Sequence, residues 1–174
     1  MFVANGIAAI AGAAKDAAGE LAELAAQTDA ASGMIQAKLG LSSEDADKLA
    51  ESAKAVWKEG FGDSVTDVAN DLATVSQYLG DMSDTDMQSV LEKAYTISDV
   101  FGADVPESVK AVRTMMQNFG ISSGEAFDII TAGYQNGLDY SGEFLDTLNE
   151  YSPQFEAMGY SAEDALNLLK NGAD

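Results

Sequence analysis

A pattern of about forty residues recurs four times along this chain of 174 residues. Each copy contains a large apolar residue followed by a glycine, and a serine stands two or three positions after the glycine. An acidic residue then follows the serine at the third position. The glycines are Gly40, Gly80, Gly120 and Gly159, so their spacings are 40, 40 and 39. A chain with such a period is expected to fold as similar units that bury their apolar faces against one another.

Each part of this pattern has a meaning at the end of an α-helix. Glycine tolerates the left-handed conformation that closes a helix, and the apolar residue before it is then expected to make the last core contact. A serine with an acid three positions later is a capping box, which opens the next helix. The apolar residues are Leu39, Leu79, Phe119 and Met158; the serines are Ser42, Ser83, Ser122 and Ser161; the acids are Asp45, Asp86, Glu125 and Asp164.

Apolar stripes with helical spacing fill the second half of each unit, behind Phe61, Phe101 and Leu138. Pro106 fits the first turn of its helix, whereas Pro153 lies deeper and is expected to kink or split its helix after Tyr151. The stripes are Val65, Val68, Leu72, Val75 and Leu79; Val105, Val109, Val112, Met116 and Phe119; and Phe144, Leu148, Phe155 and Met158.

The fold class is therefore predicted to be all-α, with tandem helix-turn-helix repeats whose length is the period of the glycines. We expect an alanine-rich helical segment at 1–33, cut from a longer chain, and a helical repeat domain at 34–174. The expected units lie at about 40–58, 62–98, 102–136 and 139–172. The apolar start "MFVANGIAAIAGAA" is too short to span a bilayer and lacks the basic region of a signal peptide.

The composition excludes several classes of function. The chain has neither cysteine nor histidine, which removes thiolate zinc sites, cysteine nucleophiles and histidine general bases. The net charge is −20, and the segments 1–40, 41–80, 81–120 and 121–174 carry −2, −5, −4 and −9. Such a surface repels phosphate backbones, so direct binding of nucleic acid is not expected. The alternative is that the acidity only keeps the chain soluble.

Gly120-Ile121-Ser122-Ser123-Gly124 matches the G-x-S-x-G pattern of serine hydrolases. That pattern requires a preceding strand and a histidine partner. The chain has no histidine, and Ser122 occupies the same place in the repeat as three other serines. We therefore interpret Ser122 as a helix cap.

The other candidate sites have simpler structural interpretations. Asp81 to Glu92 resembles an EF-hand loop, but Asp86 replaces the required glycine and Gln88 an apolar residue. Carboxylate pairs such as Asp63 with Asp67, or Glu143 with Asp146, are common on solvated helices. The aromatic residues Trp57, Tyr78, Tyr95, Tyr134 and Tyr151, and a possible groove of Met115, Met116 and Phe119, are interpreted as packing. We predict no enzyme activity and no catalytic, cofactor-binding or metal-binding residue.

From about Met34 to Gly172 the sequence resembles the helical repeat region of tape measure proteins of long-tailed phages and prophages. The resemblance rests on "IQAKLGLSSEDADKLAESAKAVWKEGFGDSVTDV", "FGADVPESVKAVRTMMQNFGISSGEAFDII" and "NGLDYSGEFLDTLNEYSPQFEAMGYSAEDALNLL". It implies a virion structural protein that acts in tail assembly, determines tail length and leaves ahead of the DNA at ejection.

The resemblance also implies partners and a place. The expected partners are other copies of the chain and the tail tube or tail assembly proteins, with no membrane span in this segment. The expected location is the lumen of the tail tube in the virion, and the host cytoplasm during assembly. The alternative is an acidic helical adaptor or secreted effector that binds a protein partner through a repeat face.

Overall fold

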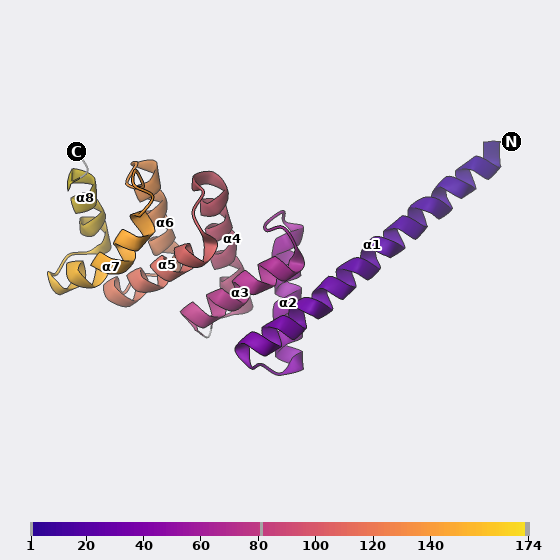
Figure 1. Ribbon diagram of the computed structural model, residues 1–174, viewed down its shortest axis with the longest axis horizontal. Coiled ribbons are helices and arrows are strands. Elements are labelled where there is room, and N and C mark those ends of the chain that lie inside the picture. The colour runs from indigo at the N-terminus through magenta and orange to yellow at the C-terminus, as the bar shows by residue number, and fades with distance from the viewer. Residues whose placement is uncertain (1, 81, 173–174) are drawn as a thin grey trace. The chain divides into compact units, whose positions relative to one another are not determined.

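The computed structural model describes the backbone of residues 2–80 and 82–172, and the side chains of these residues from position 19 onward. This part of the chain folds into eight α-helices and contains no strand, which confirms the all-α prediction (Figure 1). The helices are α1 (Phe2–Leu39), α2 (Ser43–Lys58), α3 (Val65–Leu79), α4 (Asp84–Phe101), α5 (Val105–Phe119), α6 (Ser123–Gln135), α7 (Phe144–Ala157) and α8 (Ala162–Gly172).

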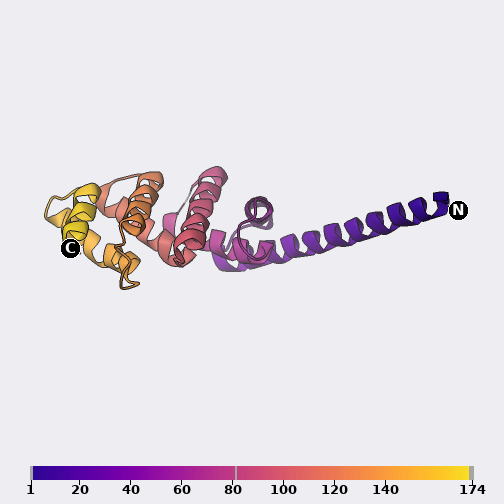
Figure 2. The same cartoon turned by 90° about the horizontal axis from the view of Figure 1, so that it is seen from above.

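Two compact units make up the chain, Met1–Asn70 and Asp71–Asp174, and the border between them lies within α3. In the first unit α2 packs against the C-terminal part of α1, where Ala31 and Ile35 are fully buried. The Ser32 hydroxyl donates a hydrogen bond to Asp47 Oδ1 at 2.5 Å and ties the two helices together. The rest of α1 continues past α2 as one unbroken helix (Figures 1 and 2). The proposed division at residues 33 and 34 stays a prediction.

Helices of the second unit pack on the helix two places along the chain. α5 contacts α7, while α4 contacts α6 and α6 contacts α8. Figure 2 shows α4, α6 and α8 following one another along the unit. The core between these helices holds apolar residues that are almost fully buried: Leu91, Val109, Val112, Met115, Phe127, Ile130 and Phe144. Apolar stripes at helical spacing thus produce the expected packed array.

The ends of the helices match the repeat. Gly40, Gly80, Gly120 and Gly159 have φ values of 67°, 76°, 67° and 82°, which confirms the expected left-handed positions. The serine that follows each of these glycines stands directly before the next helix and caps it. That whole units superpose on one another stays a prediction.

Some helix boundaries differ from those expected. α4 continues to Phe101 rather than ending near residue 98, and α7 begins at Phe144 rather than near residue 139. Residues 136–140 form turns instead of helix. Asp139 Oδ1 accepts a hydrogen bond from the Phe144 amide at 3.1 Å, so the aspartate closes this turn over the helix start.

Of the two outcomes expected at Pro153, a split of α7 is wrong, and a kink stays a prediction. The helix continues from Phe144 to Ala157 with Pro153 inside it. Proline removes the hydrogen bond to the carbonyl four residues earlier, that of Asn149, and the ring of Pro153 itself lies on the exposed side of the helix. The Ser152 hydroxyl adds a hydrogen bond to the Leu148 carbonyl at 2.6 Å.

The apolar residues at the helix ends are less buried than expected. Met158 is 63% exposed, whereas Leu39, Leu79 and Phe119 are half-buried. α7 packs mainly against α5 and makes fewer contacts with α8. In α5 the residue that enters the core is Met115, which is 1% exposed, while Met116 is half-buried.

A very close approach between helices occurs where α7 begins. The ring of Phe144 lies against the backbone of Gly133 in α6, so that a Cβ atom at residue 133 would overlap the ring. Tyr134 completes the contact: its ring lies edge-on to Phe144 with centroids 5.3 Å apart and stacks on Phe101 at 4.9 Å. These aromatic contacts join α4, α6 and α7.

We predict that Gly133→Ala destabilises the chain by about 1–3 kcal/mol, because the added methyl group collides with a buried ring that cannot move away. Gly124→Ala in the same helix is the matched control, since its Cβ would meet only Lys93 Nζ at 3.5 Å and Ser122 Oγ at 3.8 Å. Thermal melting followed by circular dichroism measures both. Equal melting temperatures for the two variants would contradict the close packing.

Candidate functional site

Ser122 lies at the N-terminus of α6 and is preceded by helix α5 rather than by a strand. Its hydroxyl accepts a hydrogen bond from the Glu125 amide at 3.2 Å and donates one to Glu125 Oε2 at 2.7 Å. The Ser122 amide donates to the same oxygen at 2.8 Å, which completes a capping box. The hydrogen bonds from the Ser122 amide and hydroxyl lower the pKa of the Glu125 carboxyl, so the carboxylate is a weaker base. The arrangement caps a helix and activates no nucleophile.

The same arrangement recurs at the other predicted serines. The Ser83 hydroxyl bonds Asp86 Oδ2 at 2.7 Å, and the Ser161 hydroxyl bonds Asp164 Oδ2 at 2.7 Å. Each serine also accepts from the amide of its acid, at 3.1 Å in both cases. The hydrogen bonds from the Ser161 hydroxyl and amide lower the pKa of the Asp164 carboxyl. With Ser42, described next, the predicted caps are confirmed at all four copies of the pattern.

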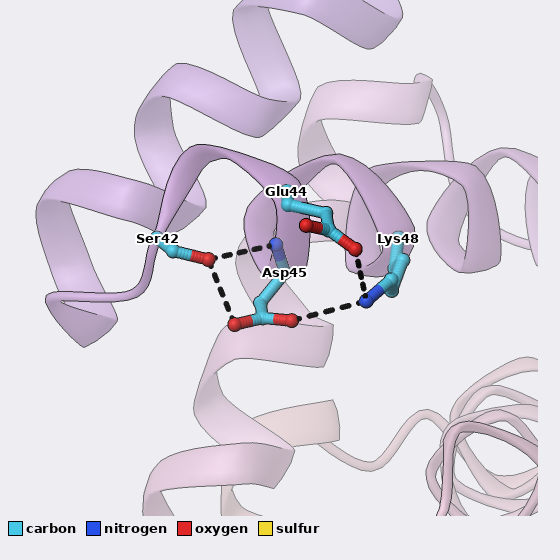
Figure 3. Close-up of polar contacts among 4 residues, drawn as sticks. All are labelled: Ser42, Glu44, Asp45 and Lys48. Atoms are coloured by element: carbon cyan, nitrogen blue, oxygen red, sulfur yellow. Dashed lines mark hydrogen bonds and ion pairs between the residues drawn. The ribbon is translucent and has the colours of Figure 1, made fainter.

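The Ser42 cap carries an additional cation (Figure 3). The Ser42 hydroxyl accepts from the Asp45 amide at 3.2 Å and donates to Asp45 Oδ2 at 2.8 Å. Lys48 Nζ reaches Glu44 Oε1 at 3.1 Å and Asp45 Oδ1 at 3.2 Å. The Ser42 hydroxyl and the Lys48 ammonium together lower the pKa of the Asp45 carboxyl, and Glu44 and Asp45 raise the pKa of Lys48. These groups are exposed, so the ion pairs contribute little to stability.

A second series of caps was missed by the sequence reasoning. Ser64 accepts from the Asp67 amide at 3.1 Å at the start of α3, and Asp104 Oδ1 accepts from the Glu107 amide at 2.9 Å at the start of α5. Gly62 and Gly102 precede these two caps, and Gly142 precedes α7, whose N-cap residue Glu143 makes no side-chain cap hydrogen bond; the φ values of the three glycines are 71°, 76° and 76°. They recur at the same interval as the first three glycines of the repeat, and this regularity was a usable signal. This spacing suggests a third unit aligned at Gly142 instead of behind Leu138, and the alignment of the units stays a prediction.

The segment that resembles an EF-hand is mostly helical. Asp81 lies outside the described residues, and α4 begins at Asp84, so Asp84 to Glu92 form helical turns rather than a loop. Ser83 serves as the cap of this helix. Across residues 19–80 and 82–172, no three histidine, cysteine or acidic side chains are grouped in a way that could hold a metal ion.

The carboxylate pairs lie at helix starts. Asp67 receives the Ser64 hydroxyl at 2.6 Å in the α3 cap. Glu143 and Asp146 border a polar hollow of about 660 Å³ between α5 and α7, together with Lys110 and Glu150. This hollow is open and lined by side chains of both charges, and it offers surface for a polar contact rather than a closed reaction chamber.

The aromatic residues do not form one patch. Trp57 borders a hollow with Leu21 and Leu24 in the first unit. Tyr95 is buried in the second unit and donates to Asp71 Oδ2 at 2.7 Å. Tyr134 borders a third hollow, of about 300 Å³, with Asp104, Glu107, Asp139 and Asp146. Burial, with added effects from Asp139 and Glu107, raises the pKa of Tyr134 to about 12, so its hydroxyl stays protonated near neutral pH.

The residues grouped by the fold are helix caps, aromatic packing pairs and shallow hollows with acidic rims. Along the described stretch of the chain, no helix is both long and apolar enough to cross a membrane.

Two comparisons with known proteins point to phage tail proteins, and a third finds no match. Residues 44–174, which are most of the chain, match the family of phage-related minor tail proteins. A stretch of 76 residues is 37% identical to the "Probable tape measure protein" of Streptomyces phage phiC31. This stretch is 43% of the present chain and 10% of that protein, so the chain spans about a tenth of the length of the relative it matches. No solved structure is significantly similar to the chain.

We predict that Ser122→Ala lowers the free energy of unfolding by about 1 kcal/mol, because the Glu125 amide loses its capping oxygen. Gly120→Val should cost more, since a β-branched residue is strained at the φ of 67° found there. Urea unfolding measures both variants, and an ester hydrolysis assay on the same samples tests the hydrolase alternative. Ester turnover that disappears in Ser122→Ala would contradict the structural role.

Proposed function

Because this chain belongs to the phage-related minor tail protein family, we propose that it is a structural segment of a tail tape measure protein. In this role it lies in the lumen of the tail tube, contributes to the length of the tail and leaves ahead of the DNA at ejection. The observation that carries the proposal is the family match over residues 44–174, supported by the similarity to a named tape measure protein.

The helical build supports a ruler made of repeated parts. One helix rises about 1.5 Å per residue, so one repeat drawn out as continuous helix spans about 60 Å. The whole chain would span about 260 Å in this form, against a radius of gyration of about 16 Å for a compact domain of the same size. A ruler works by extension, so we expect the helices of the compact units to straighten inside the tube.

The joints between helices keep the energetic cost of such straightening small. Most joints are short turns with one left-handed glycine and one capping residue, and a cap contributes about 1 kcal/mol. Helix extension through a joint loses this cap but gains continuous backbone hydrogen bonds. Contacts with other copies and with the tube wall would replace the packing between helices. The proposed partners are therefore further copies of the chain and the tail tube or assembly proteins.

The charge of the chain suits departure from the tube. The net charge of −20 gives the protein the same sign as the DNA that follows it. Like charges at close range repel, which favours release of the protein over retention on the DNA. No direct contact with nucleic acid is proposed, and the chain would occupy the host cytoplasm only during assembly.

The ruler proposal predicts that tail length changes in steps of one repeat. Deletion of residues 81–120 joins Gly80 to Ile121 and keeps the glycine and serine of one joint intact. In a phage carrying this deletion, the tail should be shorter by about 60 Å, and duplication of the same residues should lengthen it by the same amount. Electron microscopy of purified virions measures the change.

The control is Ser122→Ala in the same phage gene, which weakens a cap without changing the number of residues. Its tails should keep the normal length. Tails of unchanged length after both the deletion and the duplication would contradict the ruler proposal and favour the alternative of an adaptor or effector.

We also predict that the alanine-rich segment at 1–33 mediates self-association of the isolated chain. Leu21 in this segment is 67% exposed, and residues 1–33 carry less net negative charge per residue than the rest of the chain. A variant lacking residues 1–27 keeps Thr28, Ala31 and Ser32, which are buried in the first unit. Removal of all of residues 1–33 would damage that packing.

Light scattering and thermal melting over a range of concentrations test this segment. The intact chain should form larger species whose melting temperature rises with concentration, because association stabilises the folded state. The variant lacking residues 1–27 should stay monomeric with a constant melting temperature. If both proteins are monomeric and melt at the same temperature, the segment is not an association surface.

A further inference from the structure

A hollow of about 230 Å³ lies between α7, α8 and the turn that precedes α7. Its walls include the apolar side chains of Leu138, Phe144, Leu168 and Leu169, and it reaches the backbone of Gly172. Leu168 is 41% exposed, and Tyr140 beside it is 82% exposed. Ser141 and Thr147 also line the hollow, so its walls are of mixed polarity, with large exposed side chains at the edge. Large apolar side chains exposed together are typical of a surface that receives another protein segment.

The residues of α8 at this hollow correspond to residues of α6. A shift along the chain by the spacing from Gly120 to Gly159 aligns α6 with α8 and preserves the type of residue at four positions. The aligned pairs are Ala126 with Ala165, Phe127 with Leu166, Ile130 with Leu169, and Gly133 with Gly172.

Burial agrees in the first two pairs and differs in the last two. Ala165 is 3% exposed and Leu166 9%, close to the 0% and 2% of their counterparts in α6. Leu169 is only half-buried, whereas its counterpart Ile130 is fully buried. Gly172 is exposed, whereas Gly133 is buried. α8 therefore has the packing of α6 on one side and lacks it on the other.

What covers α6 on that side is the start of the following helix. Phe144, which is 2% exposed, places its ring against the bare backbone of Gly133. At Gly172 nothing lies within 4 Å of the position that a Cβ atom would take. The hollow at α8 is thus the unfilled counterpart of the place that Phe144 fills at α6.

We propose that this hollow is a docking site for one further helical hairpin of the same repeat, whose first helix begins with an aromatic residue. The aromatic ring would lie against Gly172 and contact Leu169, as Phe144 lies against Gly133 in α6. A second copy of the chain cannot supply this ring from its own α7, because its Phe144 is already buried. The proposal does not depend on the tape measure function.

An extended chain tests the docking site directly. Residues 134–172 are appended immediately after Gly172, so that the added copy of Phe144 follows Gly172 by eleven positions, as Phe144 follows Gly133. The appended hairpin should dock, raise the melting temperature by about 5 °C or more, and slow hydrogen exchange of the α8 amides. A matched extension with Phe144→Ala in the appended copy alone should lose both effects.

Gly172→Leu at the junction separates docking from a general effect of added length. In the chain without an extension this variant should melt at the same temperature or slightly higher, because the added side chain meets open space. In the extended chain it should abolish the gain, since leucine occupies the place of the ring. If the extended chains with Gly172, Gly172→Leu and Phe144→Ala all melt and exchange alike, the docking site is refuted. Dimerisation of the unextended chain that Gly172→Leu abolishes would assign the hollow to a second copy and would equally overturn the proposal.

Discussion

The structure depends on short caps that satisfy the unpaired backbone groups at the ends of its helices. An α-helix leaves unpaired amides at its start and unpaired carbonyls at its end, and a chain that is helical almost throughout must satisfy many of them. Here a serine or aspartate accepts an amide hydrogen bond three positions on, and a left-handed glycine ends the previous helix. These few polar groups mark where most of the helices begin. The apolar stripes can then meet at a constant register.

The fold class and most helix boundaries could be predicted from the sequence because caps are local. Ser122 and Gly120 act within four residues of themselves, so their effect is visible without knowledge of the packing. Asp139, by contrast, accepts the Phe144 amide across an irregular turn, and Pro153 lies inside an unbroken helix with its ring exposed. Both outcomes depend on how the surrounding chain is arranged. The overlap of Phe144 with a Cβ at Gly133 depends on two helices meeting, which no local pattern reports.

At the candidate site, the sequence predicted the capping role of Ser122 but not the packing around it. The lack of histidine and cysteine is a property of composition, and the assignment of Ser122 as a cap followed from its three counterparts in the repeat. The hollow at Gly172 could not be predicted from the sequence. Gly172 and Gly133 occupy equivalent sequence positions and differ in the side chains that cover them. Family membership came from similarity over residues 44–174 and not from any single residue.

The regular placement of the capped joints has a consequence for how such a gene can change. Gly80 and Gly120 are followed by similar residues and stand at equivalent helix ends, so unequal recombination between them would cut the protein at two interchangeable points. One product would lose a unit and the other would gain one. The new junction in each product would keep a terminating glycine and a capping serine. Evolution could therefore vary the number of units without first passing through a misfolded intermediate. The capped joint is therefore also a position at which genes can recombine while the helices on either side keep their ends.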